Sequence, residues 1–126
     1  YDQLYVLAHQ NRNLLIKAFE ESLDFIIMES PILLSNIYLN DLSIYDSDLF
    51  KNFTLDLFNK YDNVNFFLNR NNDMNYINTG RIHNEVESRM VDSQILNYLR
   101  NNNIEFTRFE MNEKTVNNIK LNLEQI

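Results

Sequence analysis

Apolar residues recur at helical spacing in four stretches of the chain, which predicts four amphipathic helices. The stretches are residues 3–20, 47–60, 84–101 and 112–126. Ser47, Asn84 and Asn112 stand where N-cap residues are expected, and Glu87 completes a capping-box pattern with Asn84. The positions expected to face a core are Leu4, Leu7, Leu14, Leu15, Ala18, Phe19, Phe50, Phe53, Leu57, Phe58, Val86, Met90, Ile95, Leu99, Val116, Ile119, Leu123 and Ile126.

Three short apolar runs lie between the predicted helices and are expected to be β-strands, at residues 24–29, 64–68 and 104–111. In the first, Phe25-Ile26-Ile27-Met28 shows no alternation with polar residues, which is typical of a strand buried on both faces of a parallel sheet. Residues 31–46 are expected to be a loop with a short helical piece. The alternation of helices and strands predicts an α/β fold with three layers, a parallel sheet covered by helices on both faces.

The composition supports a single domain over residues 1–126 with a substantial core, because 44% of the residues are apolar. The chain has no Cys, which excludes disulfides and thiolate metal sites and suits a reducing compartment such as the cytoplasm. Its longest apolar runs are too short to cross a bilayer. The net charge of −7 disfavours general nucleic-acid binding, which needs clustered Lys and Arg. We therefore expect no nucleic-acid or membrane partner, and any phosphate site must use a few placed arginines.

The first candidate for chemistry is Glu29, which ends the first predicted strand. In open α/β sheets, ligands bind at the carboxyl ends of the strands. A carboxylate there can organise Mg²⁺ through water or accept a proton from an acceptor hydroxyl. The alternative is a strand that happens to end in Glu beside a turn.

The second candidate is the segment from Arg70 to Asp92, a predicted loop of residues 69–82 that leads into a helix. Arg81 and Arg89 lie on either side of the expected helix start, and the single Gly of the chain, Gly80, directly precedes Arg81. An arginine on a loop can close over a phosphoryl group and neutralise its charge. The alternative is a solvated loop and helix with surface ion pairs such as Glu85–Arg89, which has i, i+4 spacing.

Gln10 and Arg12 on the first predicted helix form a third candidate, since they could reach a base or a phosphate of an acceptor. A solvated helix face is the alternative for this pair. Metal-binding and hydrolase motifs do not occur: His9 and His83 are far apart, and the chain has neither an HExxH nor a GxSxG sequence.

With these residues in view, the chain resembles the P-loop nucleotide and nucleoside kinases. It is most similar to small AAA-type ATPase/kinase domains of bacteriophages, relatives of the kinase domain that acts on ribosylnicotinamide. The resemblance spans nearly the whole chain and depends on the order of several segments more than on any single motif. The segments that carry it are Leu7-Ala8-His9-Gln10-Asn11-Arg12, the run from Met28 to Tyr38, the run from Asn63 to Arg70, Tyr76, Gly80-Arg81 and the run from Glu85 to Asp92.

The resemblance implies ATP as phosphoryl donor with Mg²⁺, and a nucleotide or nucleoside as acceptor. It also implies a cytoplasmic protein of a bacterial or phage-infected cell, and an open sheet edge leaves a homo-oligomer as a further expectation. The roles it implies are a carboxylate and Mg²⁺ contact through water at Glu29, lid or phosphate contacts at Arg70, Arg81 and Arg89, and acceptor contacts at Gln10, Arg12, Ser30 and Tyr38. Glu29 and Arg81 are then expected to converge at the carboxyl edge of the sheet. Position 29 is Glu where the phage group more often has Asp.

The family begins with a strand and a GxxxxGK[ST] loop that holds the ATP phosphates. This chain starts at Tyr1 and has one Gly, so it cannot contain that loop. We expect it to be the C-terminal portion of a kinase that does not bind ATP tightly in isolation. The alternative is a catalytically dead relative that makes protein contacts, and the coding sequence upstream of Tyr1 would separate the two. A flavodoxin-like or receiver domain is disfavoured, because only Glu29 fits the acidic cluster that a receiver needs.

Overall fold

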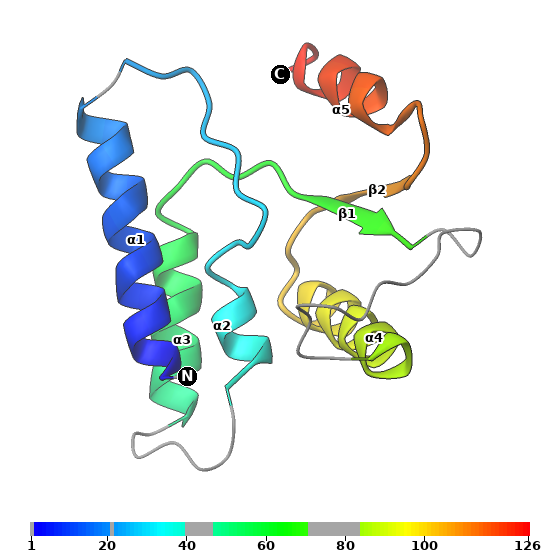
Figure 1. Cartoon of the computed structure of the whole chain (residues 1–126). Coiled ribbons are helices and arrows are strands. Elements are labelled where there is room, and N and C mark those ends of the chain that lie inside the picture. The colour runs from blue at the N-terminus through cyan, green and yellow to red at the C-terminus, as the bar shows by residue number, and fades with distance from the viewer. Residues whose placement is uncertain (1, 21, 40–46, 71–83) are drawn as a thin grey trace. The chain divides into compact units, whose positions relative to one another are not determined.

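The computed structural model describes residues 2–20, 22–39, 47–70 and 84–126. The chain divides into two compact units, Tyr1–Asn63 and Val64–Ile126, and each is described by itself. The first unit contains α1 (Gln3–Glu20), α2 (Leu34–Ile37) and α3 (Ser47–Phe58). The second contains β1 (Phe66–Asn69), α4 (Glu85–Asn101), β2 (Thr107–Glu110) and α5 (Thr115–Leu123) (Figure 1). The prediction of one domain over residues 1–126 stays a prediction.

The first unit confirms the predicted helices and the short helical piece between them. At the start of α1, the Asp2 Oδ1 atom accepts a hydrogen bond from the Leu4 N–H group at 3.0 Å. The short helix α2 contacts both α1 and α3. The buried apolar side chains of the unit are Leu7, Ile32, Leu33, Phe50 and Phe58.

Polar side chains also join the elements of the first unit. The Asn36 amide of α2 donates to the Lys51 carbonyl of α3 at 3.2 Å, whereas the buried Thr54 hydroxyl donates at 2.9 Å to the Phe50 carbonyl within α3 itself. The Tyr61 hydroxyl donates to the Asn11 Oδ1 atom at 2.7 Å and so connects the end of α3 to α1. Burial raises the pKa of the Tyr61 phenol above its ordinary value of about 10.

The strand predicted at residues 24–29 is not formed. Residues 22–30 have no regular secondary structure, and Phe25, Ile26 and Ile27 are 59%, 40% and 88% exposed. A β-strand exists only when its backbone pairs with a neighbour. The described part of the first unit offers three helices and no strand for such pairing, so the apolar run stays unpaired.

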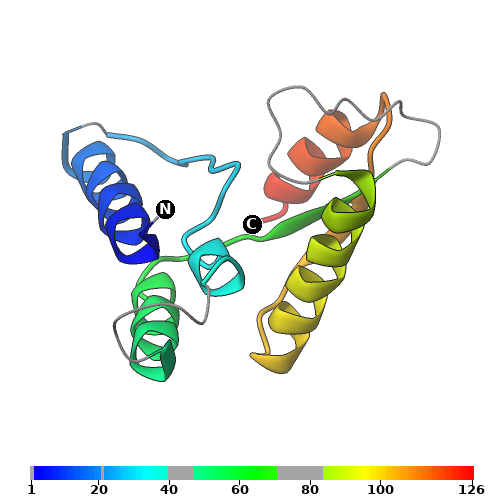
Figure 2. The ribbon, with the colours of Figure 1, turned by 60° about the horizontal axis from the view of Figure 1, so that its bottom comes forward.

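The second unit is a β–α–β unit followed by a helix. Strands β1 and β2 are parallel, in the register Phe66↔Thr107 to Asn69↔Glu110. The helices α4 and α5 lie on opposite sides of this strand pair (Figures 1 and 2). The predicted strands at 64–68 and 104–111 and their parallel pairing through a crossover helix are confirmed, although each strand is four residues long. The described residues contribute two strands to a sheet, and the three-layer fold stays a prediction.

Local capping determines both ends of α4. Asn84 and Glu87 form the predicted capping box, in which each side chain accepts from the other residue's N–H group at 2.9 Å. At the other end Asn103 has a φ of 54°, in the left-handed region that Asn tolerates. Its N–H group donates to the Arg100 carbonyl and that of Ile104 donates to the Leu99 carbonyl, the two bonds of a Schellman motif.

The predicted cap of the last helix was wrong by two residues. The helix α5 begins at Thr115, and Lys114 occupies the N-cap position without a side-chain cap. Asn112 instead accepts a hydrogen bond from the Lys114 N–H group at 2.8 Å. The Thr115 hydroxyl accepts from the Asn112 N–H group at 2.8 Å and donates to the Glu110 carbonyl at 2.6 Å. This hydroxyl joins β2 directly to α5, which favours the later helix start.

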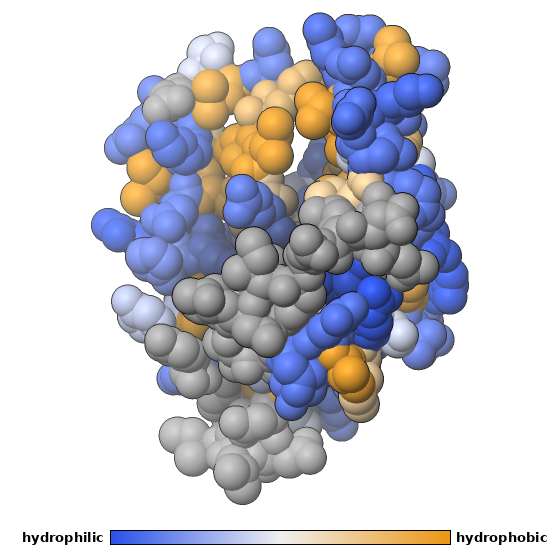
Figure 3. Space-filling view, turned by 45° about the vertical axis from the view of Figure 1, so that its right-hand side comes forward, coloured by the Kyte–Doolittle hydropathy of each residue, from blue (hydrophilic) through white to orange (hydrophobic). Residues whose placement is uncertain are grey.

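Several side chains predicted to face a core are exposed. Leu99, Phe50, Phe58 and Leu7 are buried as expected. Each unit has about 63 residues, and a unit of this size cannot cover every apolar side chain that its helices carry. Apolar residues are accordingly visible at the surface in Figure 3. The predicted core positions that are exposed are Leu4, Leu15, Ala18, Phe19, Phe53, Val86, Met90, Val116 and Ile126.

Candidate functional site

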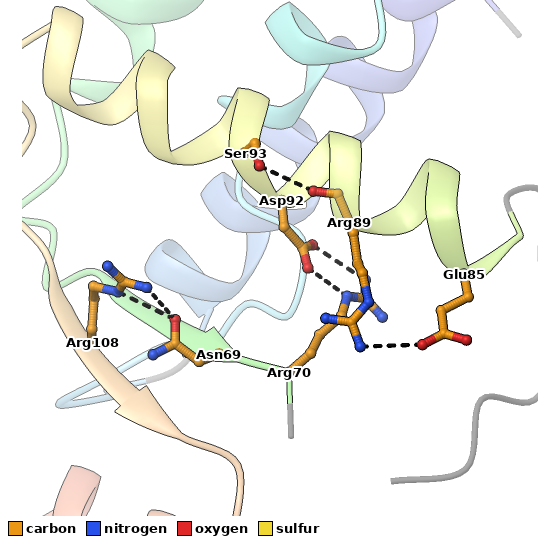
Figure 4. A network of polar contacts seen from close by, with 7 residues as sticks. All are labelled: Asn69, Arg70, Glu85, Arg89, Asp92, Ser93 and Arg108. Atoms are coloured by element: carbon orange, nitrogen blue, oxygen red, sulfur yellow. Dashed lines mark hydrogen bonds and ion pairs between the residues drawn. The ribbon is translucent and has the colours of Figure 1, made fainter. Parts of the chain in front are cut away.

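Arg70 directly follows β1, at the carboxyl end of that strand. Its guanidinium group forms two hydrogen bonds with Asp92 near the middle of α4, Nε to Oδ2 at 2.5 Å and Nη2 to Oδ1 at 3.2 Å (Figure 4). The two side chains are 33% and 26% exposed. This two-point geometry fixes the plane of the guanidinium group. The pair therefore orients an arginine at the strand end where α/β units bind ligands.

Arg89 lies on α4, and its Nη2 atom contacts the Glu85 Oε1 atom at 3.1 Å (Figure 4). The spacing is i, i+4 and both side chains are exposed. This is the surface ion pair that the sequence offered as the alternative to a lid role. An exposed pair of this kind contributes little to stability.

A second polar cluster, which sequence reasoning missed, lies on one face of the β1–β2 pair. Arg108 donates to the Asn69 Oδ1 atom from Nε at 3.2 Å and from Nη2 at 2.8 Å (Figure 4). Asn69 in turn donates to the Glu110 Oε1 atom at 2.6 Å, and the Arg108 guanidinium lies 5.9 Å from the centre of the Phe67 ring. The sequence indicates part of this cluster, because Arg108 and Glu110 lie two residues apart in a predicted strand and so share one face.

In the first unit, the structure brings together two of the predicted acceptor residues. The Gln10 Nε2 atom donates to the Ser30 carbonyl at 3.3 Å. The Gln10 Oε1 atom is buried and has no hydrogen-bond partner among the described residues. Arg12, Glu29 and Tyr38 are exposed. The Gln10–Ser30 contact joins the residues before α2 to α1.

Arg81 and Gly80 lie outside the described residues, as does Tyr76. Glu29 belongs to the first unit, and Arg70 and Arg89 belong to the second. The expected convergence of Glu29 and Arg81 is therefore still a prediction.

Metal binding at Glu29 is also still a prediction. Among residues 2–20, 22–39, 47–70 and 84–126, no group of three or more His, Asp or Glu side chains is placed to hold a metal ion. A magnesium ion that accompanies ATP takes most of its ligands from phosphates and water and needs only one or two carboxylates. An exposed single carboxylate such as Glu29 fits that requirement, whereas it would not form a metal site by itself.

The helices of the described residues do not combine the length and the hydropathy that a membrane span requires. Comparisons of the chain with models of protein families, with curated proteins and with solved structures find no match. The resemblance to P-loop kinases therefore rests on the sequence segments quoted for it and on no matched relative.

Proposed function

We propose that this chain is the C-terminal portion of a phosphoryl-transfer domain that uses ATP and Mg²⁺ to phosphorylate a nucleotide or nucleoside. One observation carries the proposal: in a parallel β–α–β unit, Arg70 directly follows the first strand, and Asp92 orients that arginine by two hydrogen bonds. Ligands of such units bind beyond the carboxyl ends of the strands, and a planar guanidinium group matches phosphate oxygens.

The chemistry assigned to the second unit is charge neutralisation. The Arg70 face that binds the Asp92 carboxylate has the geometry that binds two phosphate oxygens. A phosphoryl group would therefore either share Arg70 with Asp92 or take its place. Arg89 and Arg81 are assigned supporting roles around the same phosphates, with Arg89 released from its exposed pair with Glu85.

In this proposal, residues of the first unit bind the acceptor and contact Mg²⁺ through water. Gln10 and Ser30 are already joined, which supports a common role for them in holding an acceptor. Glu29 precedes Ser30 and would contact Mg²⁺ through water. Arg12 and Tyr38 are the further acceptor contacts in this assignment.

The test is phosphoryl transfer from radiolabelled ATP to a panel of nucleosides and nucleotides, with protein made from the coding sequence that includes the region upstream of Tyr1. Arg70→Ala should lower kcat/KM at least about tenfold, equivalent to about 1.4 kcal/mol of barrier. Arg70→Lys should recover little, because an ammonium group cannot bind two oxygens in the plane. The matched control is Arg100→Ala, since Arg100 is an exposed arginine in the last turn of α4. Equal rates for Arg70→Ala and Arg100→Ala would overturn the assignment.

A second candidate is a protein-interaction module without catalysis. The exposure of Phe25, Ile26 and Ile27 favours it, because contiguous exposed apolar residues mark interaction surfaces. The two candidates differ in the assay above: an interaction module transfers no phosphate to any acceptor, with or without the upstream region.

A further inference from the structure

We propose that residues 23–29 form a docking strand for a partner protein that supplies an extended apolar segment with a basic residue at each end. This inference rests on the second candidate function, the interaction module, and it shares Glu29 with the proposed metal contact. Peptide binding tests it separately from phosphoryl transfer. Its basis is a segment with the composition of a β-strand, a backbone that pairs with no other described residue, and a carboxylate at each end of its apolar run.

The backbone of this segment is available for pairing. No backbone N–H or carbonyl group of residues 22–29 forms a hydrogen bond with another described residue, and the first such contact is the Ser30 carbonyl with Gln10. Residues 25–28 have no regular secondary structure. The chain bends at Asp24 and at Glu29, on either side of these four residues. An unpaired backbone in a segment of strand-forming residues can accept another strand, which satisfies its donors and acceptors.

The apolar side chains of the segment are also exposed, apart from the half-buried Met28. Leu23, Phe25 and Ile27 are 46%, 59% and 88% exposed, and Ile26 is 40% exposed. In a strand, residues two apart share a face, so Leu23, Phe25 and Ile27 would form the more exposed face. Phe and Ile are favourable strand residues, and strand addition would bury this face against the alternate side chains of a partner.

The carboxylates at the two ends of the apolar run determine which charges on a partner strand are favourable. Asp24 and Glu29 flank the four apolar residues. In an antiparallel pair of two copies centred on Ile26 and Ile27, Asp24 stands opposite Glu29 at both ends. A parallel pair in register places each carboxylate opposite itself. Like charges opposite each other destabilise a strand pair, so a second copy is a poor partner and a segment with Lys or Arg at both ends is a good one. The net charge of −7 attracts such a partner further.

The test uses the whole chain and labelled six-residue peptides, with a four-residue run of Val, Ile and Thr flanked by Lys at both ends or by Glu at both ends. Fluorescence anisotropy should show that the Lys-flanked peptide binds about tenfold more tightly, because two facing charge pairs change from repulsive to attractive. The preference should weaken as salt is added. A Lys-flanked peptide with N-methylated backbone amides should not bind, since strand addition needs those donors.

Two variants check the site. The double variant Asp24→Lys/Glu29→Lys should prefer the Glu-flanked peptide, a reversal that simple loss of folding cannot produce. Ile27→Pro should abolish binding of both peptides while the helical circular dichroism is unchanged. Equal binding of both peptides, retained binding of the N-methylated peptide, or no binding at all would overturn the proposal. So would a dimer in analytical ultracentrifugation that Ile27→Pro dissociates, since that result would identify a second copy as the partner.

Discussion

Residues 25–28 and strand β1 are both four residues long and mainly apolar, and they differ in whether another segment of the chain pairs with their backbone. Strand β1 contains Phe66, Phe67 and Leu68 and pairs along its whole length with β2. Residues 25–28 contain Phe25, Ile26 and Ile27 and pair with no described residue. The helix α4 explains the difference, since it forms a crossover that returns the chain parallel to β1. A segment with high strand propensity therefore forms a strand only where a neighbouring backbone pairs with it.

The two units also differ in the interactions that stabilise each of them. The second unit has a backbone ladder, a capping box and a Schellman motif, all of which are local or strand-paired hydrogen bonds. The first unit depends on helix packing around Leu7, Ile32 and Phe50 and on side-chain bonds such as Tyr61–Asn11. Three substitutions test this contrast, in order of expected effect.

The largest effect is expected from proline in the paired strand. Thr107→Pro removes the N–H group that donates to the Asn65 carbonyl at 3.0 Å, at a residue whose side chain is exposed. We expect a loss of about 2–3 kcal/mol from the unfolding free energy of the second unit. Amide hydrogen exchange at residues 66–69 reports this directly. Ile27→Pro is the matched change in the unpaired segment and should alter stability by less than about 0.5 kcal/mol. Equal losses in the two variants would show that residues 25–28 are paired in solution.

An intermediate effect is expected from the side-chain bond that joins the turn after α3 to α1. Tyr61→Phe removes the donor to Asn11 and should lower the unfolding free energy by about 1 kcal/mol at pH 7. The folded-state pKa of Tyr61 lies above the unfolded value of about 10. As the pH rises through that value the unfolded chain loses its proton first, so the wild type loses stability above pH 10 and keeps it below.

The pH dependence provides the control for this substitution. The difference between wild type and Tyr61→Phe should be constant from pH 7 to about pH 9 and should shrink above about pH 10. The other six tyrosines are common to both proteins and cancel in the difference. Urea denaturation followed by circular dichroism gives the measurement. A difference that grows above pH 10 would contradict burial of the phenol.

The smallest effect of the three is expected at the cap of α4. Asn84→Ala removes the acceptor for the Glu87 N–H group and should cost up to about 1 kcal/mol. Asn97→Ala is the matched control, because Asn97 is an exposed asparagine inside the same helix, where Ala is the better helix former. Hydrogen exchange in the first turn of α4 should rise for Asn84→Ala alone. Equal exchange in the two variants would show that the cap contributes nothing to the start of α4.

Features that depend on neighbouring residues in the sequence were predicted well. The helix α1, the capping box at Asn84 and the end of α4 near Asn102 all match the structure. The parallel pairing of β1 with β2 also followed from the order of elements. Inward-facing positions were predicted less well, since Val86 and Met90 are exposed although both lie on the apolar face of α4. Periodicity identifies that face but does not supply a surface to cover it.

The contacts of the candidate site also fall into two groups, those that follow from sequence spacing and those that depend on the tertiary structure. The i, i+4 pair of Arg89 with Glu85 could be predicted from spacing alone. The pairing of Arg70 with Asp92 joins residues 22 positions apart, and that of Arg108 with Asn69 joins residues 39 apart. Neither partner could be chosen without the packing of α4 and the strand register.

By itself, the sequence determined where most helices begin and end, because caps, turns and periodicity act within a few residues. The start of α5 is the exception, since the Thr115 hydroxyl joins it to the Glu110 carbonyl of β2. Only the tertiary structure decided which strand-forming segments are paired, which apolar faces are covered and which carboxylate meets each arginine. These outcomes depend on contacts between distant parts of the chain, where several partners are chemically equivalent and geometry selects among them. Residues 25–28 show the result most clearly: the local signal for a strand is strong, and the described part of their own unit offers no strand to pair with.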